Sequence, residues 1–339
     1  MKKILMITTG GTIACRAGEN GLAPALSPDE LLSYIPSVKE ICEVDAISAC
    51  HLDSTNITPY HWDLMVRAIE ENYEKYDGFV ICHGTDTLAY TGAALSYMIQ
   101  NSKKPIVITG AQKPIDTVVT DAKTNLLDSF IYACDDQSQN VSIVFDGKVI
   151  VGTRARKERT KSFNAFSSLN YPFTAVIVDG MLVRYIEEKE LEGDVRFYHN
   201  MCESICTLKM IPGMRGDILS YLFENYDCIV LESFGVGGIP QKMTEAFYRE
   251  MEKWQGRGKY VVMTTQSAKE GSHMTVYEVG QRVKRDFRLI EAYDMSFEAT
   301  ITKMMWILGL GENTYDTVRE KFYTQINHDI LFTKRIENE

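Results

Sequence analysis

The sequence predicts an α/β protein with a doubly wound, mostly parallel sheet in a large N-terminal domain and a second, smaller α/β domain. Short apolar segments alternate with longer segments of helical periodicity along most of the 339 residues. The apolar segments are continuous runs, which is typical of strands buried on both faces of a parallel sheet. A charged stretch without periodicity, residues 187–200, interrupts the alternation. We therefore predict a first domain at 1–190, a linker at 191–210 and a second domain at 211–339.

The first domain alternates predicted strands with predicted helices. Its strands are expected at 1–7, 78–82, 105–109, 141–145, 148–153 and 175–178. Thr58 and Pro59 are typical of a helix N-cap and first turn, and the apolar residues that follow at helical spacing predict a helix there. Further helices are expected at 88–99 and 121–134.

The second domain repeats this pattern over fewer elements. Its helices are expected at 216–225, 241–254 and 296–308, and its strands at 228–231 and 260–264. The alternation predicts a smaller sheet of the same general kind.

Composition excludes several classes of partner. The chain has 36 basic and 46 acidic residues and a net charge of −10. This charge argues against nucleic acid as a principal partner, because phosphate neutralisation needs a basic face. No run approaches the roughly 18 apolar residues of a membrane span, so we expect no membrane association. The apolar stretch after the two N-terminal lysines is too short for a secretory signal.

The cysteines and histidines give no metal-binding pattern. Only Cys202 and Cys206 lie close together among the eight cysteines, and the six histidines lack the H-E-x-x-H spacing. We predict no metal and no cofactor. Scattered cysteines without a signal segment favour a reducing, cytoplasmic compartment.

A glycine-rich turn follows the first predicted strand. Gly10 and Gly11 allow the backbone to turn sharply and leave the hydroxyl of Thr12 open to a ligand. A nucleotide-binding turn is disfavoured because neither G-x-G-x-x-G nor a following Gly-Lys-Ser/Thr is present. A plain tight turn remains an alternative.

A second junction of this kind lies at His83-Gly84-Thr85-Asp86-Thr87, between a predicted strand and a predicted helix. Free backbone N–H groups at such a junction favour negative charge. Asp and Thr are also ordinary N-cap residues, so a capping role remains an alternative. Ligands of doubly wound sheets bind at the carboxyl ends of the strands, where both Thr12 and Thr85 are predicted to lie.

Basic residues cluster at 154–161. A phosphate or nucleic-acid patch is one interpretation, but Glu158 and the acidic chain favour a solvated loop. A third interpretation is that one cation belongs to a catalytic site, and lysine suits that role because burial lets it accept a proton.

These residues support one class of reaction. A threonine hydroxyl is a weak nucleophile and needs a base, and the sequence has no G-x-S-x-G motif. Acyl transfer through a threonyl ester, with a lysine as proton acceptor, fits the two threonines and the basic loop. The alternative is that all of them are caps or turns.

The segments Thr9-Gly10-Gly11-Thr12-Ile13-Ala14 and His83–Thr87 together resemble the two signature motifs of the L-asparaginase family, with the bacterial cytoplasmic type I branch as the nearest likeness. Further segments of similarity are 52–58, 104–112, 125–127, 235–237, 265–266 and 298–299. The resemblance covers nearly the whole chain. It implies a homo-oligomer, a dimer or a tetramer built from close dimers.

The resemblance also implies roles for individual residues. Thr12 resembles the nucleophile that becomes acylated, and Thr85 the second catalytic threonine, with Lys157 as its base. Asp86 is implied both in catalysis and in binding the α-amino group of the substrate, where Thr85 also takes part. Ser54 resembles the residue that holds the α-carboxylate.

The polar neighbour of that serine is Thr55, which the resemblance places in the substrate site as well.

The chain departs from the family at two positions. Leu22 stands near a tyrosine that many relatives have in a mobile loop, so we expect Thr85 and Lys157 to act on Thr12 too. Gly238 stands where relatives often have an asparagine that reaches the neighbouring subunit's substrate.

The resemblance implies an amidohydrolase that converts L-asparagine to L-aspartate and ammonia. A glutaminase or glutaminase-asparaginase is an alternative, because one methylene separates the two substrates. An amidotransferase component that releases ammonia for tRNA-bound glutamate is less consistent, since such relatives have an added N-terminal domain. A non-catalytic amino-acid sensor is the alternative from another class, although it would be expected to lack Thr12 or Lys157.

Overall fold

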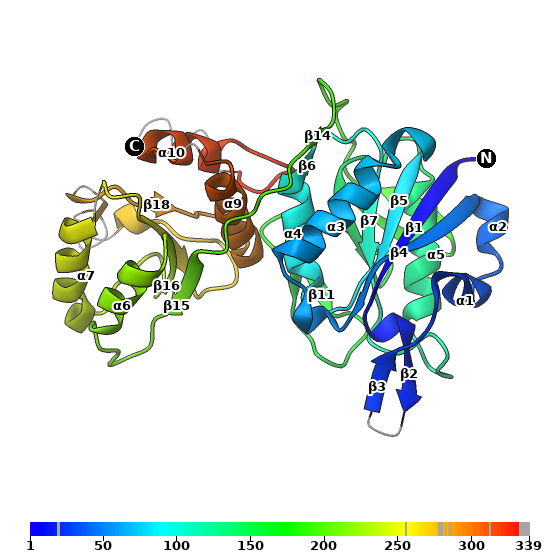
Figure 1. The fold of residues 1–339 in the computed structure, drawn as a ribbon, viewed down its shortest axis with the longest axis horizontal. Coiled ribbons are helices and arrows are strands. Elements are labelled where there is room, and N and C mark those ends of the chain that lie inside the picture. The colour runs from blue at the N-terminus through cyan, green and yellow to red at the C-terminus, as the bar shows by residue number, and fades with distance from the viewer. Residues whose placement is uncertain are drawn as a thin grey trace. The chain divides into compact units, whose positions relative to one another are not determined.

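The computed structural model describes residues 1–18, 21–254, 256–276, 281, 283–284, 286–311 and 313–331. They form two compact units, Met1–His199 and a second unit that begins at Asn200. Figure 1 shows a sheet in each unit with helices packed beside it.

The first unit is built on an eight-stranded sheet in the order β13-β12-β9-β8-β7-β5-β1-β4. The strands are β1 (Lys3–Gly10), β4 (Glu43–Leu52), β5 (Gly78–Cys82), β7 (Ile106–Thr109), β8 (Val141–Phe145), β9 (Lys148–Val151), β12 (Ala175–Val178) and β13 (Met181–Arg184). β4, β1, β5, β7 and β8 run parallel, and β9, β12 and β13 add antiparallel pairs at one side. The predicted, mostly parallel sheet is confirmed.

Helices cover both faces of this sheet (Figure 1). One face carries α1 (Pro28–Ser33), α2 (Val38–Ile41) and α5 (Ala122–Ala133), whose apolar residues join one core with those of the strands. The other face carries α3 (Pro59–Glu70) and α4 (Leu88–Met98), which pack against each other. Every residue of β5 and β8 is buried, as a sheet covered on both faces requires.

The crossover through α5 differs in hand from those through α3 and α4. The chain steps from β5 to β7 and from β7 to β8 in the same direction, but α4 and α5 lie on opposite faces. Parallel crossovers are right-handed in nearly all proteins, so this reversal is an unusual feature of the fold. It sends the segment 110–121 towards the face of α5, and this segment contributes a residue to the site described below.

The second unit has a four-stranded parallel sheet in the order β15-β16-β17-β18. Its strands are β15 (Ile205–Lys209), β16 (Cys228–Ser233), β17 (Tyr260–Thr265) and β18 (Ile290–Glu291), and its helices include α6 (Ile218–Asn225), α7 (Gln241–Trp254), α9 (Phe297–Gly309) and α10 (Tyr315–Tyr323). This is the smaller α/β domain predicted from the sequence. Strand β15 falls within the range 191–210 predicted as a linker, and the domain boundaries remain a prediction.

Short elements complete the described chain. They are the strands β2 (Cys15–Gly18), β3 (Gly21–Pro24), β6 (Ile99–Gln100), β10 (Ala155–Lys157), β11 (Phe166–Ser168) and β14 (Arg196–Phe197), and 3₁₀ turns at Thr12–Ala14, Ser54–Asn56, Tyr73–Lys75 and Met274–Val276. β2 pairs with β3 in an antiparallel hairpin, and β10 pairs with β11 in the same way.

The sequence pattern missed strand β4, which is the longest in the sheet. β4 lies at the edge, and its residues alternate between exposed and half-buried, so it has no continuous apolar run. By contrast, α3 begins after Thr58 with Pro59 in its first turn, as predicted, and buries Trp62, Met65, Val66 and Ile69. Strand β1 extends to Gly10, three residues beyond the predicted end, because its pairing with β4 continues to Gly10.

Candidate functional site

Four neighbouring parallel strands carry polar residues just past their carboxyl ends. Thr12 follows β1, Ser54 follows β4, Thr85 follows β5, and Gln112 follows β7. Because these strands are adjacent in the order β7-β5-β1-β4, their carboxyl ends lie along one edge of the sheet. This edge is where the sequence predicted a ligand site.

Two glycines let the loops of this edge touch. Gly11 has φ +75°, and a β-carbon there would lie 2.4 Å from the Cα atom of Gly84. A β-carbon on Gly84 would lie 2.6 Å from Oγ of Ser54. The turn after β1 and the second motif are therefore packed backbone to backbone, and the backbone of Gly84 also lies against the side chain of Ser54, which only glycine permits.

Thr85 lies at the centre of a hydrogen-bonded group. Nζ of Lys157 donates to Oγ1 of Thr85 at 2.8 Å and to Oδ1 of Asp86 at 2.6 Å. The Thr85 hydroxyl donates in turn to Oε1 of Gln112 at 3.1 Å. Thr85 is buried, whereas the side chain of Asp86 is 57% exposed. The arrangement holds a hydroxyl against an amine while leaving a carboxylate open to solvent.

Lys157 reaches this position from β10, which is paired with β11. The outcome for the basic cluster at 154–161 is mixed. The interpretation as a solvated loop is wrong for Arg154, which is fully buried and stacked over Tyr171 with 5.7 Å between guanidinium carbon and ring centroid. It holds for residues 158–161, which are exposed. Lys157 alone extends to Thr85 and Asp86.

Ser54 is buried and holds the second motif in place. Its Oγ accepts a hydrogen bond from the backbone N–H of Asp86 at 3.2 Å, and its carbonyl accepts one from the hydroxyl of Thr87 at 2.8 Å. Thr55 is exposed and donates both its N–H and its hydroxyl to the carboxylate of Asp53. Ser54 therefore joins the group around Thr85, and Thr55 is engaged with Asp53.

Thr12 stands beside this group without being hydrogen-bonded to it. It is half-buried at the start of a 3₁₀ turn, and its hydroxyl makes no hydrogen bond with the described part of the chain. The backbone at position 22 pairs with Ala17 in the β2–β3 hairpin. The side chain of Leu22, which the family resemblance placed near an expected tyrosine, lies outside what the structure describes.

Gln112 is a site residue that the sequence reasoning missed. Its backbone N–H donates to the Asp121 carboxylate, at 2.9 Å to Oδ2, and its Nε2 donates to the carbonyls of Arg159 and Ser162 at 3.2 and 3.1 Å. These bonds fix the amide with its oxygen facing Thr85. Two signals were available, its position after a predicted strand and its place at the end of the family-like segment 104–112.

The side chain of His83 is neutral and is hydrogen-bonded to the backbone of the second motif, His83–Thr87. Its Nδ1 lies 2.7 Å from the carbonyl oxygen of Gly84, so Nδ1 carries the proton, and Nε2 accepts from the hydroxyl of Thr91 at 3.0 Å. That hydroxyl accepts a bond from Nε1 of Trp62. Complete burial lowers the pKa of His83 to about 4. His83 is therefore a fixed donor to the Gly84 carbonyl at neutral pH and not a base.

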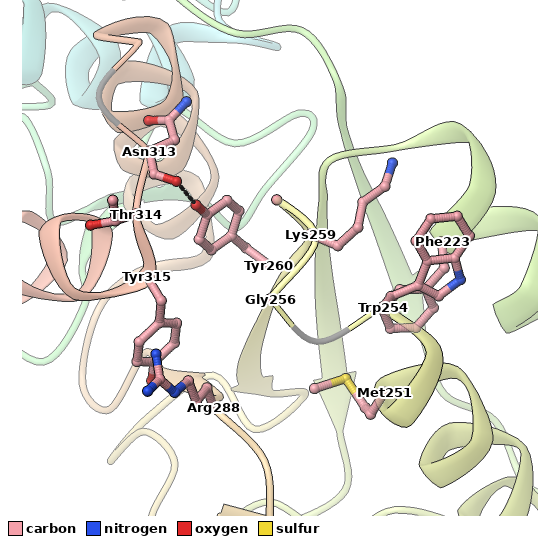
Figure 2. A pocket seen from close by; sticks show the side chains of 11 residues that line it. Phe223, Met251, Trp254, Gly256, Lys259, Tyr260, Arg288, Asn313, Thr314 and Tyr315 are labelled. Carbon is pink, nitrogen blue, oxygen red and sulfur yellow. Dashed lines mark hydrogen bonds between the residues drawn. The ribbon is translucent and has the colours of Figure 1, made fainter.

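The second unit has a cavity of its own, of about 540 Å³. Figure 2 shows Trp254, Tyr260 and Tyr315 around it, with Lys259 and Arg288. The hydroxyl of Tyr260 donates to the Asn313 carbonyl, and Lys259 is paired with Asp227. The described lining thus has no hydroxyl–amine pair like that of Thr85 and Lys157.

Metal and membrane features are also defined for the described residues. Within the ranges given above, no group of three or more His, Cys, Asp or Glu side chains is arranged to hold a metal ion. None of the helices in those ranges is long and apolar enough to cross a membrane.

The chain is similar to known proteins over nearly its full length. Residues 3–190 match the family model described as "Asparaginase, N-terminal", and residues 204–322 match the "Glutaminase/Asparaginase C-terminal domain". An L-asparaginase of Thermococcus kodakarensis is 38% identical, with 91% of this chain and 93% of the relative aligned. A component of the glutamyl-tRNA(Gln) amidotransferase from Pyrococcus furiosus is 32% identical, over 90% of this chain and 72% of that protein.

A solved structure gives the same result for the fold. The thermostable L-asparaginase from Thermococcus kodakarensis superimposes with a TM-score of 0.90 at 35% identity, covering 97% of this chain and 99% of that one.

Proposed function

We propose that this chain, which belongs to the asparaginase family, hydrolyses L-asparagine to L-aspartate and ammonia. The observation that carries the proposal is the contact between the Thr85 hydroxyl and the amine of Lys157, beside Asp86 and at the carboxyl ends of parallel strands. Acyl transfer through a threonine requires a base for the attacking hydroxyl, and we assign that role to Lys157 acting through Thr85.

The reaction has two halves. Oγ1 of Thr12 attacks the carbon of the side-chain amide, the C–N bond breaks, and the nitrogen leaves as ammonia after gaining a proton. A water molecule then attacks the threonyl ester, the C–O bond breaks, and L-aspartate leaves while Thr12 regains its proton. Lys157 and Thr85 form the proton path for both halves, since Lys157 can hold the proton that the attacking oxygen loses.

Asp86 and Ser54 anchor the substrate. The exposed carboxylate of Asp86 suits an α-ammonium group, and the Ser54 hydroxyl can donate to the α-carboxylate. In the free protein Asp86 is paired with Lys157 at 2.6 Å. A substrate ammonium at Asp86 would share that carboxylate and so weaken the ion pair between Asp86 and Lys157. Because the carboxylate then stabilises the charged amine less, proton transfer away from Lys157 becomes easier, and the neutral amine can accept the proton of Thr85.

Gln112 gives Thr85 its direction. Its fixed amide oxygen accepts a hydrogen bond from the Thr85 hydroxyl in the free protein, and the two bonds that its Nε2 donates to carbonyls prevent the amide from turning. We assign it a positioning role. Thr55, whose hydroxyl is bonded to Asp53, contributes to the substrate site through the turn it shares with Ser54.

The cellular setting and assembly are also proposals. All eight cysteines are free thiols, which suits a reducing cytoplasm. A homotetramer built from close dimers, or a dimer, is expected from the family resemblance. Gly238 has no side chain to offer a neighbouring subunit, so another residue would complete any shared site.

Ammonia release from L-asparagine and from L-glutamine by the purified protein tests the function. We expect fast release from asparagine and slower release from glutamine, because the extra methylene displaces the amide, an effect worth about 10–200-fold. The Thr12→Ala variant should lose turnover and still bind asparagine, since it removes the nucleophile and leaves Asp86 and Ser54.

Thr160→Ala, which changes an exposed threonine of the loop 158–161, is the matched control and should keep wild-type rates. Activity of Thr12→Ala above about one per cent of wild type would move the nucleophile to Thr85. Asparagine binding without ammonia release by the wild type would favour the sensor.

A further inference from the structure

A cavity of about 440 Å³ in the first unit borders the face of α5 that supports Gln112. Its described lining includes the carboxylates of Asp121, Asp128, Asp146 and Asp179, and it includes no lysine or arginine. Asp121 and Asp128 lie seven residues apart on α5 and its N-terminal flank, so they share one face of the helix. Carboxylates from three separate segments thus meet at one acidic cavity.

Hydrogen bonds or turn geometry explain why three of these positions, 121, 146 and 179, are aspartates. The Asp121 carboxylate accepts bonds from the N–H groups of Gln112 and Lys113 and from Asn125. Asp146 precedes Gly147, and the two have φ angles of 51° and 68°, as an Asp-Gly hairpin turn requires. Its carboxylate also pairs with Lys148 at 2.7 Å.

Asp179 precedes Gly180 in a turn of the same kind, with φ angles of 52° and 72°. The backbone therefore accounts for its residue type. Its carboxylate is exposed at the rim of the cavity and has no partner within the described ranges.

Asp128 has no such explanation. It is only 7% exposed, and within the described ranges its carboxylate forms no hydrogen bond and no ion pair. Burial raises the pKa of Asp128 to about 6. The carboxylate is open to the cavity, because its oxygens are not among the fully buried atoms that lack a hydrogen bond. A carboxylate this deeply buried is rarely left without a charged partner. The side chain borders the cavity, so the missing partner would enter there.

The surroundings narrow the chemistry of that partner. A bare metal ion is disfavoured, because no three ligand-type side chains of the described residues are arranged around a common point. The cavity is much larger than one ion, and Phe163 and Ile177 add apolar surface to its wall. Two carboxylates without partners in the described chain, Asp128 inside and Asp179 at the rim, suit two positive charges joined by an apolar chain.

We propose that this cavity binds a protonated diamine or polyamine, with one ammonium group on Asp128 and another on Asp179. The methylene chain between them lies against Phe163 and Ile177. Charge-assisted hydrogen bonds to the two carboxylates provide the specificity, and one ammonium on the buried carboxylate removes the penalty of leaving it unpaired.

Titration calorimetry with 1,4-diaminobutane at pH 8 tests the proposal on the full-length protein. We expect saturable binding to the wild type, weaker binding of n-butylamine, and a loss of about tenfold or more in Asp128→Asn. Asp179→Asn should weaken the diamine and leave n-butylamine unchanged. Asp217→Asn, which removes an exposed carboxylate of the second unit, is the matched control and should bind like wild type.

Thermal unfolding gives a second readout, because a ligand that binds only the folded chain raises its Tm. Diaminobutane should raise the Tm of the wild type and not that of Asp128→Asn. Without amine, Asp128→Asn should be at least as stable as the wild type at pH 8, because the asparagine carries no buried charge.

Three results would overturn the proposal. The first is equal binding of diaminobutane to wild type and Asp128→Asn, or no saturable binding. The second is Mg²⁺ binding that Asp128→Asn abolishes while diaminobutane does not compete, which would make this a metal site. The third is a change of oligomeric state in Asp128→Asn, which would make a side chain of a second copy the partner of Asp128.

Discussion

Gly11 and Gly84 approach so closely that a β-carbon on Gly11 would lie 2.4 Å from Cα of Gly84. The contact joins the turn after β1 to the turn after β5, and it sets Thr12 beside the group formed by Thr85 and Lys157. The candidate site therefore depends on a backbone contact as much as on its reactive side chains.

Gly11→Ala should destabilise the protein by more than the backbone strain alone. The strain of an L-residue at φ +75° and ψ 176° is about 1–3 kcal/mol, and the clash with Gly84 adds to it. Gly213, at φ +81°, has open space at its β-carbon, so Gly213→Ala carries only the strain. Urea unfolding of both variants measures the difference. Equal losses would mean that the Gly11–Gly84 contact is not a constraint.

Lys157→Met should remove most of the activity at neutral pH, because Thr85 loses the amine hydrogen-bonded to its hydroxyl, the group that we propose as proton acceptor. The expected loss in kcat is about 10²–10⁴-fold, the usual range for a general base. Lys161→Met, an exposed lysine of the neighbouring loop, should keep wild-type kcat. If Lys157→Met also kept wild-type rates, Lys157 would be only a partner of Asp86.

Gln112→Leu should reduce kcat with a smaller effect on KM. The substitution removes the acceptor of the Thr85 hydroxyl and the two donor contacts to the carbonyls of Arg159 and Ser162. A misplaced catalytic hydroxyl lowers the rate of the chemical step more than it lowers binding. Steady-state kinetics with asparagine separate the two effects. A rise in KM at constant kcat would instead assign Gln112 to substrate binding.

His83 should stay neutral down to about pH 4, since its burial lowers its pKa to about 4. The unfolded chain then binds a proton that the folded chain does not, between about pH 6.5 and pH 4. Folding stability from this group is therefore complete above about pH 6.5 and is lost as pH falls, by about 3 kcal/mol in total.

Imidazole ¹⁵N shifts check this, with the His83 signals assigned from a His83→Gln spectrum. We expect the Nδ1-protonated neutral form throughout the range from about pH 5 to about pH 8. A protonation midpoint near the ordinary value of about 6.5 would show that the ring is accessible to water. The hydrogen bond to Gly84 would then need another explanation.

The sequence by itself determined the fold class and the two junctions that carry the candidate site. Buried parallel strands need continuous apolar runs, so β5, β7 and β8 could be predicted from the order of their apolar residues alone. Thr12 lies shortly after the apolar run of β1, and Thr85 shortly after that of β5. Both could therefore be placed at the carboxyl ends of strands. The resemblance to asparaginases supplied roles for Lys157 and Ser54 that spacing alone could not.

Only the tertiary structure decided how these segments meet. The edge strand β4 has no apolar run, so its pairing with β1, which brings Ser54 to Gly84, could not be read from periodicity. The contact of Lys157 with Thr85 joins residues 72 positions apart and depends on the pairing of two short strands. Gln112 is distinguished by its contact with Thr85, which lies in a distant part of the sequence. Asp128 is distinguished by being buried without a partner in the described chain. Periodicity could predict neither feature.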